Sequence, residues 1–287
     1  MPSSVTAFCP GHLSGYFSPV IGRDPASTGS IGAGMVISEG VTAHVTRAGA
    51  REIVVRRADE QGNILCEVSR SPPLAYLMEK LSVTVRIETV CRLPISAGFG
   101  LSAASLVSSA LAINTLCNLG LSREACCAIA HEAEIVHHTG LGDVAACQGG
   151  GRDFREGAGI YAPITRYFDI REPLFALNFG PLPSSNVLSS QEALHRVARA
   201  YPRGIPDSPL RFFELSRTFA ENCGLLTQEV SEILTQCEQE GVPASMTMLG
   251  NGVFSLGLRG GEIFSAYDEV YELRLAESGP RITGIVP

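Results

Sequence analysis

The sequence predicts a globular protein that mixes strands and helices over about two domains. Its 287 residues are enough for two units that each bury a core. Hydrophobic residues make up 45% of the chain and charged residues 18%, a composition that favours compact folding over disorder. Residues 81–90 alternate and are rich in β-branched side chains, whereas 102–117 is apolar almost all round. A strand is therefore expected to lead into a buried helix.

Charge and composition exclude several classes of partner. The net charge is -7 and the pI is about 5.4, so we expect neither a nucleic acid nor an anionic membrane as partner. No run of 18 apolar residues is present, and the first residues lack the basic start of a signal peptide. The nine cysteines are scattered without a C-x-x-C pair, which predicts small buried thiols in a reducing cytoplasm.

The first third of the chain is predicted to be mainly strands. Residues 7–17 are expected to form a short strand that breaks at a Pro10-Gly11 turn. The segment 26–34 is either a loose hairpin connection or a substrate loop in which Ser30 offers a hydroxyl. Further strands are expected at 41–47, 52–57 and 64–68, followed by a short helix at 74–79 that Pro72 and Pro73 cap.

A second helix is predicted after the buried one, from an N-cap at Ser122 to about His138. On a 3.6-residue period, His131 and Glu134 share one flank of this helix, whereas Glu132 points roughly the other way. Only one of the two glutamates can therefore face a site. From about residue 164 the expected order is a strand at 175–180, helices at 190–200, 210–223 and 227–239, and then strand and helix in alternation.

Small residues fill the stretch 94–105 between the predicted strand and the buried helix. Gly98 and Gly100 permit positive φ and close approach of the backbone, and the free N–H groups near Ser102 carry the positive end of the helix dipole. This pattern favours a bound phosphate, although tight helix packing could also require it. A Walker loop is ruled out because Leu101 stands where that motif needs lysine, and Lys80 is the only lysine in the chain.

A dinucleotide site is also a poor match. Residues 98–103 fit G-x-G-x-x-A, but about 20 residues further on the chain reads Leu-Gly-Leu instead of an acidic ribose ligand. A zinc protease is excluded because Ile135 occupies the position of the second histidine in H-E-x-x-H. His131 remains open to three interpretations, namely a helix-surface residue, a transition-metal ligand with Glu134 and His138, or a substrate ligand.

Asp143 follows a run of small residues and precedes Arg152 and Arg155. A carboxylate in such a segment can come close to a bound ligand, and the same aspartate could cap a short helix that begins at Val144. Both can be true. The nearby arginines suit an anionic substrate, because a guanidinium binds a carboxylate through paired hydrogen bonds.

Three segments in one order, 9–15, 94–104 and 246–254, resemble the three motifs of the GHMP kinases over nearly the full length. Within that superfamily, residues 29–34, 130–134, 139–143 and 248–251 are similar to the archaeal pantoate kinases. The resemblance implies an α+β fold with a ribosomal-S5-domain-2-like N-terminal domain, 1–163, and a ferredoxin-like C-terminal domain, 164–287. The active site is then expected in the cleft between them.

The resemblance also implies the activity, ATP-dependent phosphorylation of the 4-hydroxyl of (R)-pantoate on the archaeal route to coenzyme A. The implied cofactors are ATP and Mg²⁺, the location is cytoplasmic, and a homodimer is expected by analogy. Two alternatives are another kinase of small alcohols, such as homoserine or shikimate kinase, and an inactive binding protein of the same fold.

Site residues follow from the resemblance position by position. Asp143 is the implied base, Ser102 and Glu134 the implied Mg²⁺ ligands, and Glu132 the second candidate if the register slips. Pantoate would be bound by Ser30, His131 and Arg155. The ATP phosphates would be bound by Pro94, Ser96, Ala97, Gly98, Phe99, Gly100, Leu101, Ser102, Ala103 and Ala104. His12 occupies the position at which mevalonate kinase carries a lysine, which leaves neutralisation of the transferring group to Mg²⁺ and the helix dipole.

Overall fold

The computed structural model describes residues 2–182, 185–267 and 269–287. Its larger sheet has the strand order β12-β1-β2-β5-β3-β4, and β6 pairs with β2 and β7. The strands are β1 (Ser4–Val20), β2 (Gly29–Arg47), β3 (Glu52–Ala58), β4 (Ile64–Val68), β5 (Val85–Cys91), β6 (Arg152–Arg155), β7 (Ile164–Tyr167) and β12 (Arg281–Val286). The strand pairs are antiparallel except for β3 with β5.

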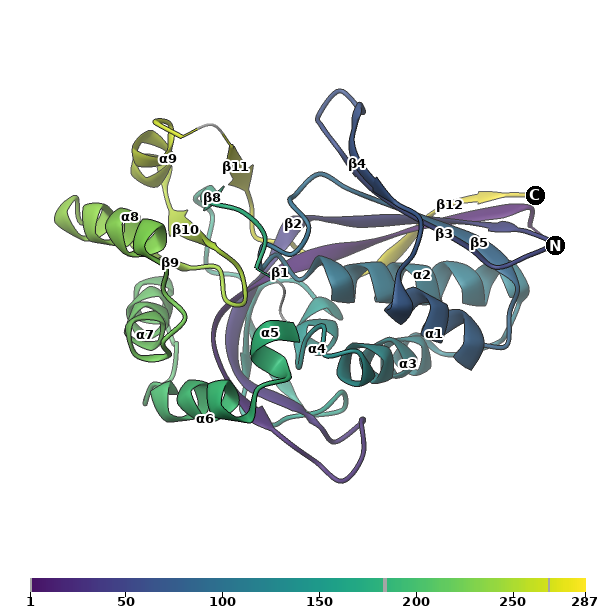
Figure 1. The fold of residues 1–287 in the computed structure, drawn as a ribbon, viewed down its shortest axis with the longest axis horizontal. Coiled ribbons are helices and arrows are strands. Elements are labelled where there is room, and N and C mark those ends of the chain that lie inside the picture. The colour runs from purple at the N-terminus through teal and green to yellow at the C-terminus, as the bar shows by residue number, and fades with distance from the viewer. Residues whose placement is uncertain (1, 183–184, 268) are drawn as a thin grey trace.

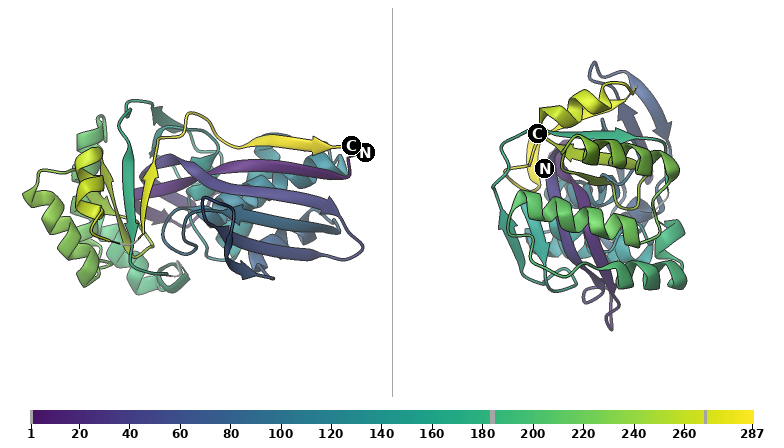
Figure 2. Two further views of the ribbon diagram at one scale, coloured as in Figure 1. Left: turned by 90° about the horizontal axis from the view of Figure 1, so that it is seen from above. Right: turned by 90° about the vertical axis from the view of Figure 1, so that its left-hand side faces the viewer.

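One face of this sheet is covered by helices (Figures 1 and 2). They are α1 (Pro72–Lys80), α2 (Leu101–Cys117), α3 (Arg123–Val136) and α4 (Asp143–Cys147). Helix α2 lies at the centre, where it packs on β1 and β2 and contacts α3 and α4. Its apolar surface runs all round because it is enclosed by the sheet and by other helices.

The smaller sheet has the order β11-β8-β10-β9, with every neighbouring pair antiparallel. Its strands are β8 (Leu174–Asn178), β9 (Ala244–Met246), β10 (Gly252–Leu256) and β11 (Val270–Leu273). Between β8 and β9 lie α5 (Ser185–Leu188), α6 (Gln191–Ala200), α7 (Pro209–Asn222) and α8 (Gln228–Gln239), and between β10 and β11 lies α9 (Leu258–Phe264). This order and connectivity are those of a ferredoxin-like unit, as predicted.

The chain passes between the two units more than once. Strand β7 pairs with β6 and strand β12 pairs with β1, so the larger sheet includes strands from beyond Pro163. The two ends of the chain are adjacent, and Ser3 N donates to Val286 O at 2.9 Å (Figure 1). The domain division at residue 163 stays a prediction. A cut at this residue would separate β7 and β12 from the larger sheet to which they belong.

Two expectations for the first strands were wrong. Strand β1 is continuous from Ser4 to Val20, and a register shift after Pro10 takes the place of the expected turn. Pairing with β12 ends at Phe8, so the missing N–H of Pro10 breaks no bond to that strand. Residues 29–34 belong to strand β2 and are no connection or loop. A Cβ on Gly32 would lie 2.2 Å from Tyr16 O, so close strand packing requires the glycine.

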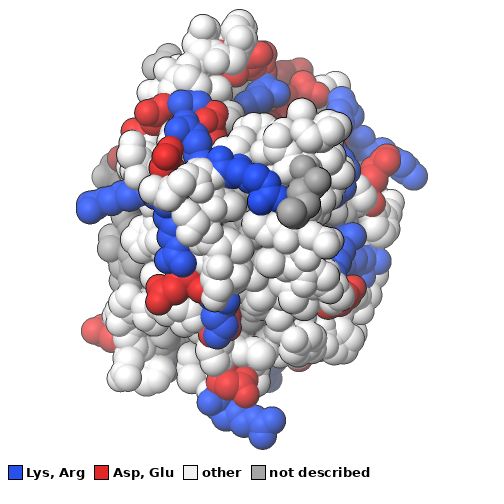
Figure 3. Space-filling model, turned by 90° about the vertical axis from the view of Figure 1, so that its right-hand side faces the viewer, with Lys and Arg blue, Asp and Glu red and all other residues white. Residues whose placement is uncertain are grey.

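The other local predictions were close. Helix α1 begins at Pro72, α2 begins one residue early at Leu101, and Ser122 Oγ accepts from Ala125 N at 3.1 Å as the N-cap of α3. Helix α3 ends at Val136, two residues before the expected end. In the described part of the chain no helix is long and apolar enough to cross a membrane. Basic and acidic side chains are interspersed on the face that holds both termini (Figure 3).

Candidate active site

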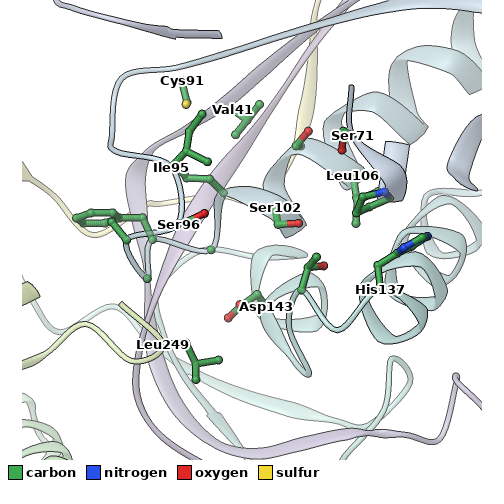
Figure 4. Close-up of a pocket in the computed structure, with 18 of the residues that line it drawn as sticks. Val41, Ser71, Cys91, Ile95, Ser96, Ser102, Leu106, His137, Asp143 and Leu249 are labelled. Atoms are coloured by element: carbon green, nitrogen blue, oxygen red, sulfur yellow. The ribbon is translucent and has the colours of Figure 1, made fainter. Parts of the chain in front are cut away.

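A cavity of about 400 Å³ lies between the helices and the sheet of the larger unit and reaches Met248 and Leu249 of the smaller unit. Its wall includes the glycine loop, the start of α1, the loop from His137 to Asp143, and single residues of β1 and β2. In Figure 4, Ser102 and Asp143 lie near one another, while Val41, Ile95 and Cys91 lie on the other side of Ser102. The cavity thus has a polar end near Asp143 and an apolar end.

The glycine loop is fixed from both sides. Gly98 and Gly100 adopt φ of 82° and 63°. A Cβ on Gly98 would lie 2.8 Å from Met248 O, and one on Gly100 would lie 2.9 Å from His12 N. His12 N donates to Phe99 O at 2.9 Å. The loop is therefore held between β1 and the segment that precedes β10, and only glycine fits at these two positions.

The N-terminus of α2 faces the cavity, and Ser102 is exposed in its first turn. Free N–H groups at that end and the dipole of the helix attract an anion such as a phosphate. Lys80 lies elsewhere, paired with Glu132 at 2.8 Å. Of the loop residues that the sequence singles out, eight line the cavity: Pro94, Ser96, Ala97, Gly98, Phe99, Gly100, Leu101 and Ser102. Ala103 and Ala104 are buried in α2 behind them.

Asp143 belongs to a line of charged side chains that crosses three elements. His12 Nδ1 on β1 lies 2.7 Å from Asp143 Oδ1, and His12 Nε2 lies 2.7 Å from Asp153 Oδ1 on β6. Asp153 forms a buried ion pair with Arg155 on the same strand. Ser14 Oγ donates to Asp143 Oδ1 at 3.5 Å. Because Oδ1 accepts these bonds, Oδ2 is the oxygen of Asp143 that is left for a ligand.

A gap in β2 makes this line possible. Gly34 pairs with Ser14 of β1 on one side and with Asp153 of β6 on the other. A Cβ on Gly34 would lie 2.1 Å from His12 Nε2. The imidazole therefore crosses over the middle strand where there is no side chain and reaches the aspartate on the far strand.

The cluster changes the titration of its members. Burial alone would lower the pKa of His12, but the charge of Asp153 and the bonds to both aspartates raise it from 6.5 to about 10. Burial would raise the pKa of Asp153, but the charges of Arg155 and His12 hold it well below its usual range. At neutral pH His12 is therefore a cation between two carboxylates.

The stability of the fold should depend on the charge of His12. A histidine whose pKa is raised on folding stabilises the native state fully below pH 6.5, and this contribution is lost as the pH rises toward 10. We expect the free energy of unfolding of the wild type to fall more steeply between pH 7 and pH 10 than that of His12→Gln. Urea unfolding at several pH values measures both slopes, and parallel curves would contradict a charged His12.

Ser30 and Arg155 meet at Gly142, next to Asp143. A Cβ on Gly142 would lie 2.6 Å from Ser30 Oγ and 3.4 Å from Arg155 Nε. Ser30 lines the cavity, and Arg155 Nε is buried without a hydrogen-bond partner in the described part of the chain. The Ser30 hydroxyl thus lines the cavity beside the carboxylate, whereas the Arg155 guanidinium lies outside the cavity wall, behind Gly142. Arg152 lies away from it, with Asp169 and Pro206 O as its partners.

His131 lies outside the cavity wall. It is fully buried, with Nδ1 3.0 Å from Glu134 Oε2 and Nε2 2.9 Å from Thr28 O. With both ring nitrogens engaged, it orients Glu134 and the turn before β2. The sequence pattern on α3 placed it beside Glu134 correctly but could not show that the turn before β2 covers it.

Glu132 and Glu134 lie on different sides of α3. Glu132 accepts from Tyr76 and Lys80 at 2.8 Å each, on the side of the helix that packs near α1. Glu134 is 1% exposed and lies beneath the 139–143 loop, where Oε1 accepts from Val144 N at 3.3 Å. A Cβ on Gly140 would lie 2.3 Å from Glu134 Oε1 and 3.2 Å from Asp143 Oδ2. Glu134 is thus the glutamate near the site, and burial raises its pKa.

The sequence analysis missed two members of the site. His12 drew notice only for replacing a lysine, and Asp153 drew none. Asp153 and Arg155 stand two residues apart, which in a strand places both on one face, so their spacing could have indicated a pair.

Comparisons with known proteins identify the fold and the family of this chain. Residues 69–151 match the model of the GHMP kinases N terminal domain. A solved structure described as a phosphotransferase related to the CoA biosynthesis pathway is 26% identical, with a TM-score of 0.78 over 98% of both chains. Mevalonate-3-kinase from Thermoplasma acidophilum is 13% identical and shares the fold, with a TM-score of 0.68 over 99% of this chain and 100% of that chain. The α+β fold is that of a GHMP kinase.

Curated relatives narrow the assignment. The chain is 44% identical to a pantoate kinase of Methanospirillum hungatei, over 97% of this chain and 96% of that protein. It is 32% identical to a pantoate kinase of Thermococcus kodakarensis, over 88% of this chain and 87% of that protein. The chain belongs to the pantoate kinase family.

Proposed function

We propose that this protein transfers the γ-phosphoryl group of ATP to the 4-hydroxyl of (R)-pantoate, on the archaeal route to coenzyme A. The observation that carries this proposal is a single cavity lined by the glycine loop, the N-terminus of α2, Asp143 and Ser30, with the buried Arg155 guanidinium behind Gly142. The relatives named pantoate kinase support the choice of substrate.

The proposed chemistry depends on position and charge. Phosphoryl transfer needs the acceptor hydroxyl in line with the phosphate, and little covalent chemistry is left for the protein. Asp143 Oδ2 is proposed to accept the hydroxyl proton, since His12 and Ser14 occupy Oδ1. Arg155 Nε and Ser30 Oγ are proposed to bind the pantoate carboxylate, because the N–H has no other acceptor in the described chain.

The residues near the phosphate end fit Mg²⁺. This ion prefers oxygen ligands and is usually held by one or two carboxylates together with substrate phosphates. The exposed Ser102 hydroxyl and the Glu134 carboxylate are the proposed ligands, and the 3.3 Å bond from Val144 N leaves Oε1 of Glu134 only weakly bound. When bound, Mg²⁺ would neutralise phosphate charge that the chain, with its single lysine, does not.

The first test is ADP release from ATP and Mg²⁺ with D-pantoate, pantothenate, homoserine, shikimate and mevalonate in parallel. We expect turnover with D-pantoate alone, as for the relatives named pantoate kinase. Homoserine is the strictest comparison, because its 4-hydroxyl and carboxylate have the same spacing but it carries an amine at C2 and lacks the two methyl groups. Activity with a different alcohol would discard the substrate assignment and keep the kinase. Binding of ATP without turnover on any acceptor would favour an inactive binding protein.

A cytoplasmic location belongs to the same proposal, supported by the free thiols found at all nine cysteines, most of them buried. The homodimer that the resemblance implies stays a prediction, which light scattering can check.

A further inference from the structure

His12 connects three parts of the site. Its main-chain N–H donates to Phe99 O of the glycine loop, its Nδ1 contacts Asp143, and its Nε2 contacts Asp153, which pairs with Arg155. We propose that His12 is a positioning residue of the phosphoryl transfer, which holds the proposed base with one ring nitrogen and the proposed substrate arginine, through Asp153, with the other. This inference rests on the proposed function of Asp143 and Arg155.

The hydrogen-bonding pattern fixes the form of the ring. An ionised carboxylate can only accept hydrogen bonds, so a histidine that binds one on each nitrogen must donate from both. The two contacts are equal at 2.7 Å, within the range of charge-assisted bonds. The ring therefore acts as a doubly donating imidazolium, and its plane sets the position of both acceptors.

Charge balance gives the cluster its cohesion. His12 and Asp153 are fully buried, so each charge needs a partner within the cluster. Two carboxylates, Asp143 and Asp153, are matched by two cations, His12 and Arg155. A neutral residue at position 12 would leave two carboxylates opposite one guanidinium, and Asp143, the only one of the four side chains that reaches the cavity, would lose its nearest cation.

The ring is surrounded by few other ionisable groups. From β6 it faces Asp153, with Arg155 and the more distant Arg166 behind, and from α4 it faces Asp143 and Cys147. Ser14 lies 3.5 Å from Nδ1 on its own strand, and β2 contributes only the bare backbone of Gly34. A change in the pH profile of a position-12 variant would therefore come from the loss of this one cation.

The test compares wild type and His12→Gln, with the exposed His44→Gln on β2 as matched control. Glutamine keeps a donor but no charge. We expect kcat to fall about 100-fold, the loss that follows displacement of a reacting group by about 1 Å. The KM for ATP should stay within about twofold, since the nucleotide loop is bonded to the main chain of residue 12 and not to its ring. The acid limb of kcat/KM for pantoate should move to higher pH, because the base has lost an adjacent cation.

A merely structural histidine would behave differently. It would lower the unfolding temperature and the amount of active enzyme but leave the pH profile and the kcat per folded enzyme unchanged, and that outcome overturns the proposal. The wild type is the reference in every case. If it phosphorylates an alcohol other than pantoate, the proposed substrate fails, and the same comparison with that alcohol still tests His12.

A second variant keeps the test open if His12→Gln does not fold. Asp153→Asn retains the bond between His12 and Asp143 but removes the carboxylate that holds Arg155. We expect the KM for pantoate to rise by about 10-fold or more with a smaller change in kcat. An unchanged KM for pantoate in Asp153→Asn would overturn the proposal. Where His12→Gln also folds, the loss in kcat/KM of the double variant should be smaller than the product of the single losses, because both changes break one network. Independent, multiplicative losses would overturn the coupling.

Discussion

Asp143→Asn is expected to lower kcat by about 10²- to 10⁴-fold, the usual contribution of a general base. Asparagine has the same shape, and its side-chain oxygen can still accept from His12 Nδ1 and Ser14. The change therefore removes the basic oxygen that faces the cavity and leaves the surrounding bonds in place. Steady-state ADP release at saturating ATP and pantoate measures the loss, and the KM for ATP should change by less than about twofold.

The matched control is Asp207→Asn, which changes an exposed aspartate outside the cavity and should leave kcat unaltered. A variant at position 143 that keeps a substantial part of wild-type turnover would show that the hydroxyl proton leaves by another route. In that case positioning and phosphate neutralisation alone would carry the reaction.

Loss of the guanidinium at position 155 is expected to act on the acceptor. Arg155→Ala should raise the KM for pantoate by about 10- to 100-fold, the value of one or two hydrogen bonds between charged groups. The KM for ATP should hardly change, because Arg155 lies behind Gly142, whereas the ATP phosphates are proposed to bind at the glycine loop and the N-terminus of α2. Equal effects on both substrates would contradict the assignment of Arg155 to the carboxylate.

Alanine also removes one of the two cations that pair with the buried Asp153, which destabilises the fold. Arg155→Lys separates the two effects, because an ammonium can still pair with Asp153 but lacks the planar fork and the Nε donor. It should fold normally and still raise the KM for pantoate. Arg203→Ala, an exposed arginine in the break before α7, is the control for loss of an arginine. Normal binding of pantoate by Arg155→Lys would show that Nε is not a substrate ligand.

Much of the site was readable from the sequence because the features are local. The positive φ of Gly98 and Gly100, the start of α2 and the cap at Ser122 each depend on a few neighbouring residues. The helical period alone showed that Glu132 and Glu134 point in different directions from α3, so that only one of them can face the site. The family likeness added the order of the units, and the ferredoxin-like sheet followed it.

Two local interpretations failed where a distant strand decided the result. Pro10-Gly11 has the composition of a turn, yet β1 runs on through it. Strand β1 stays paired with β2 on one side, and on the other side its pairing with β12 already ends at Phe8. Residues 29–34 look like a flexible connection, but their small size serves a strand packed between β1 and β6. In both cases glycine and proline were placed for close approach, which local propensity does not distinguish from a turn.

By itself the sequence predicted the glycine loop and the helices around it, which the structure confirms, and the site roles that the family resemblance implies, which stay predictions. The tertiary structure alone decided how the charges are connected. His12 and Asp153 are separated by 141 residues, and they meet only because Gly34 leaves the middle strand bare between them. His131, which the resemblance assigns to the substrate, lies buried against Thr28, outside the cavity wall. The pattern of side chains in the sequence shows which charged groups are present. The strand order and the burial decide which of these groups form ion pairs with one another.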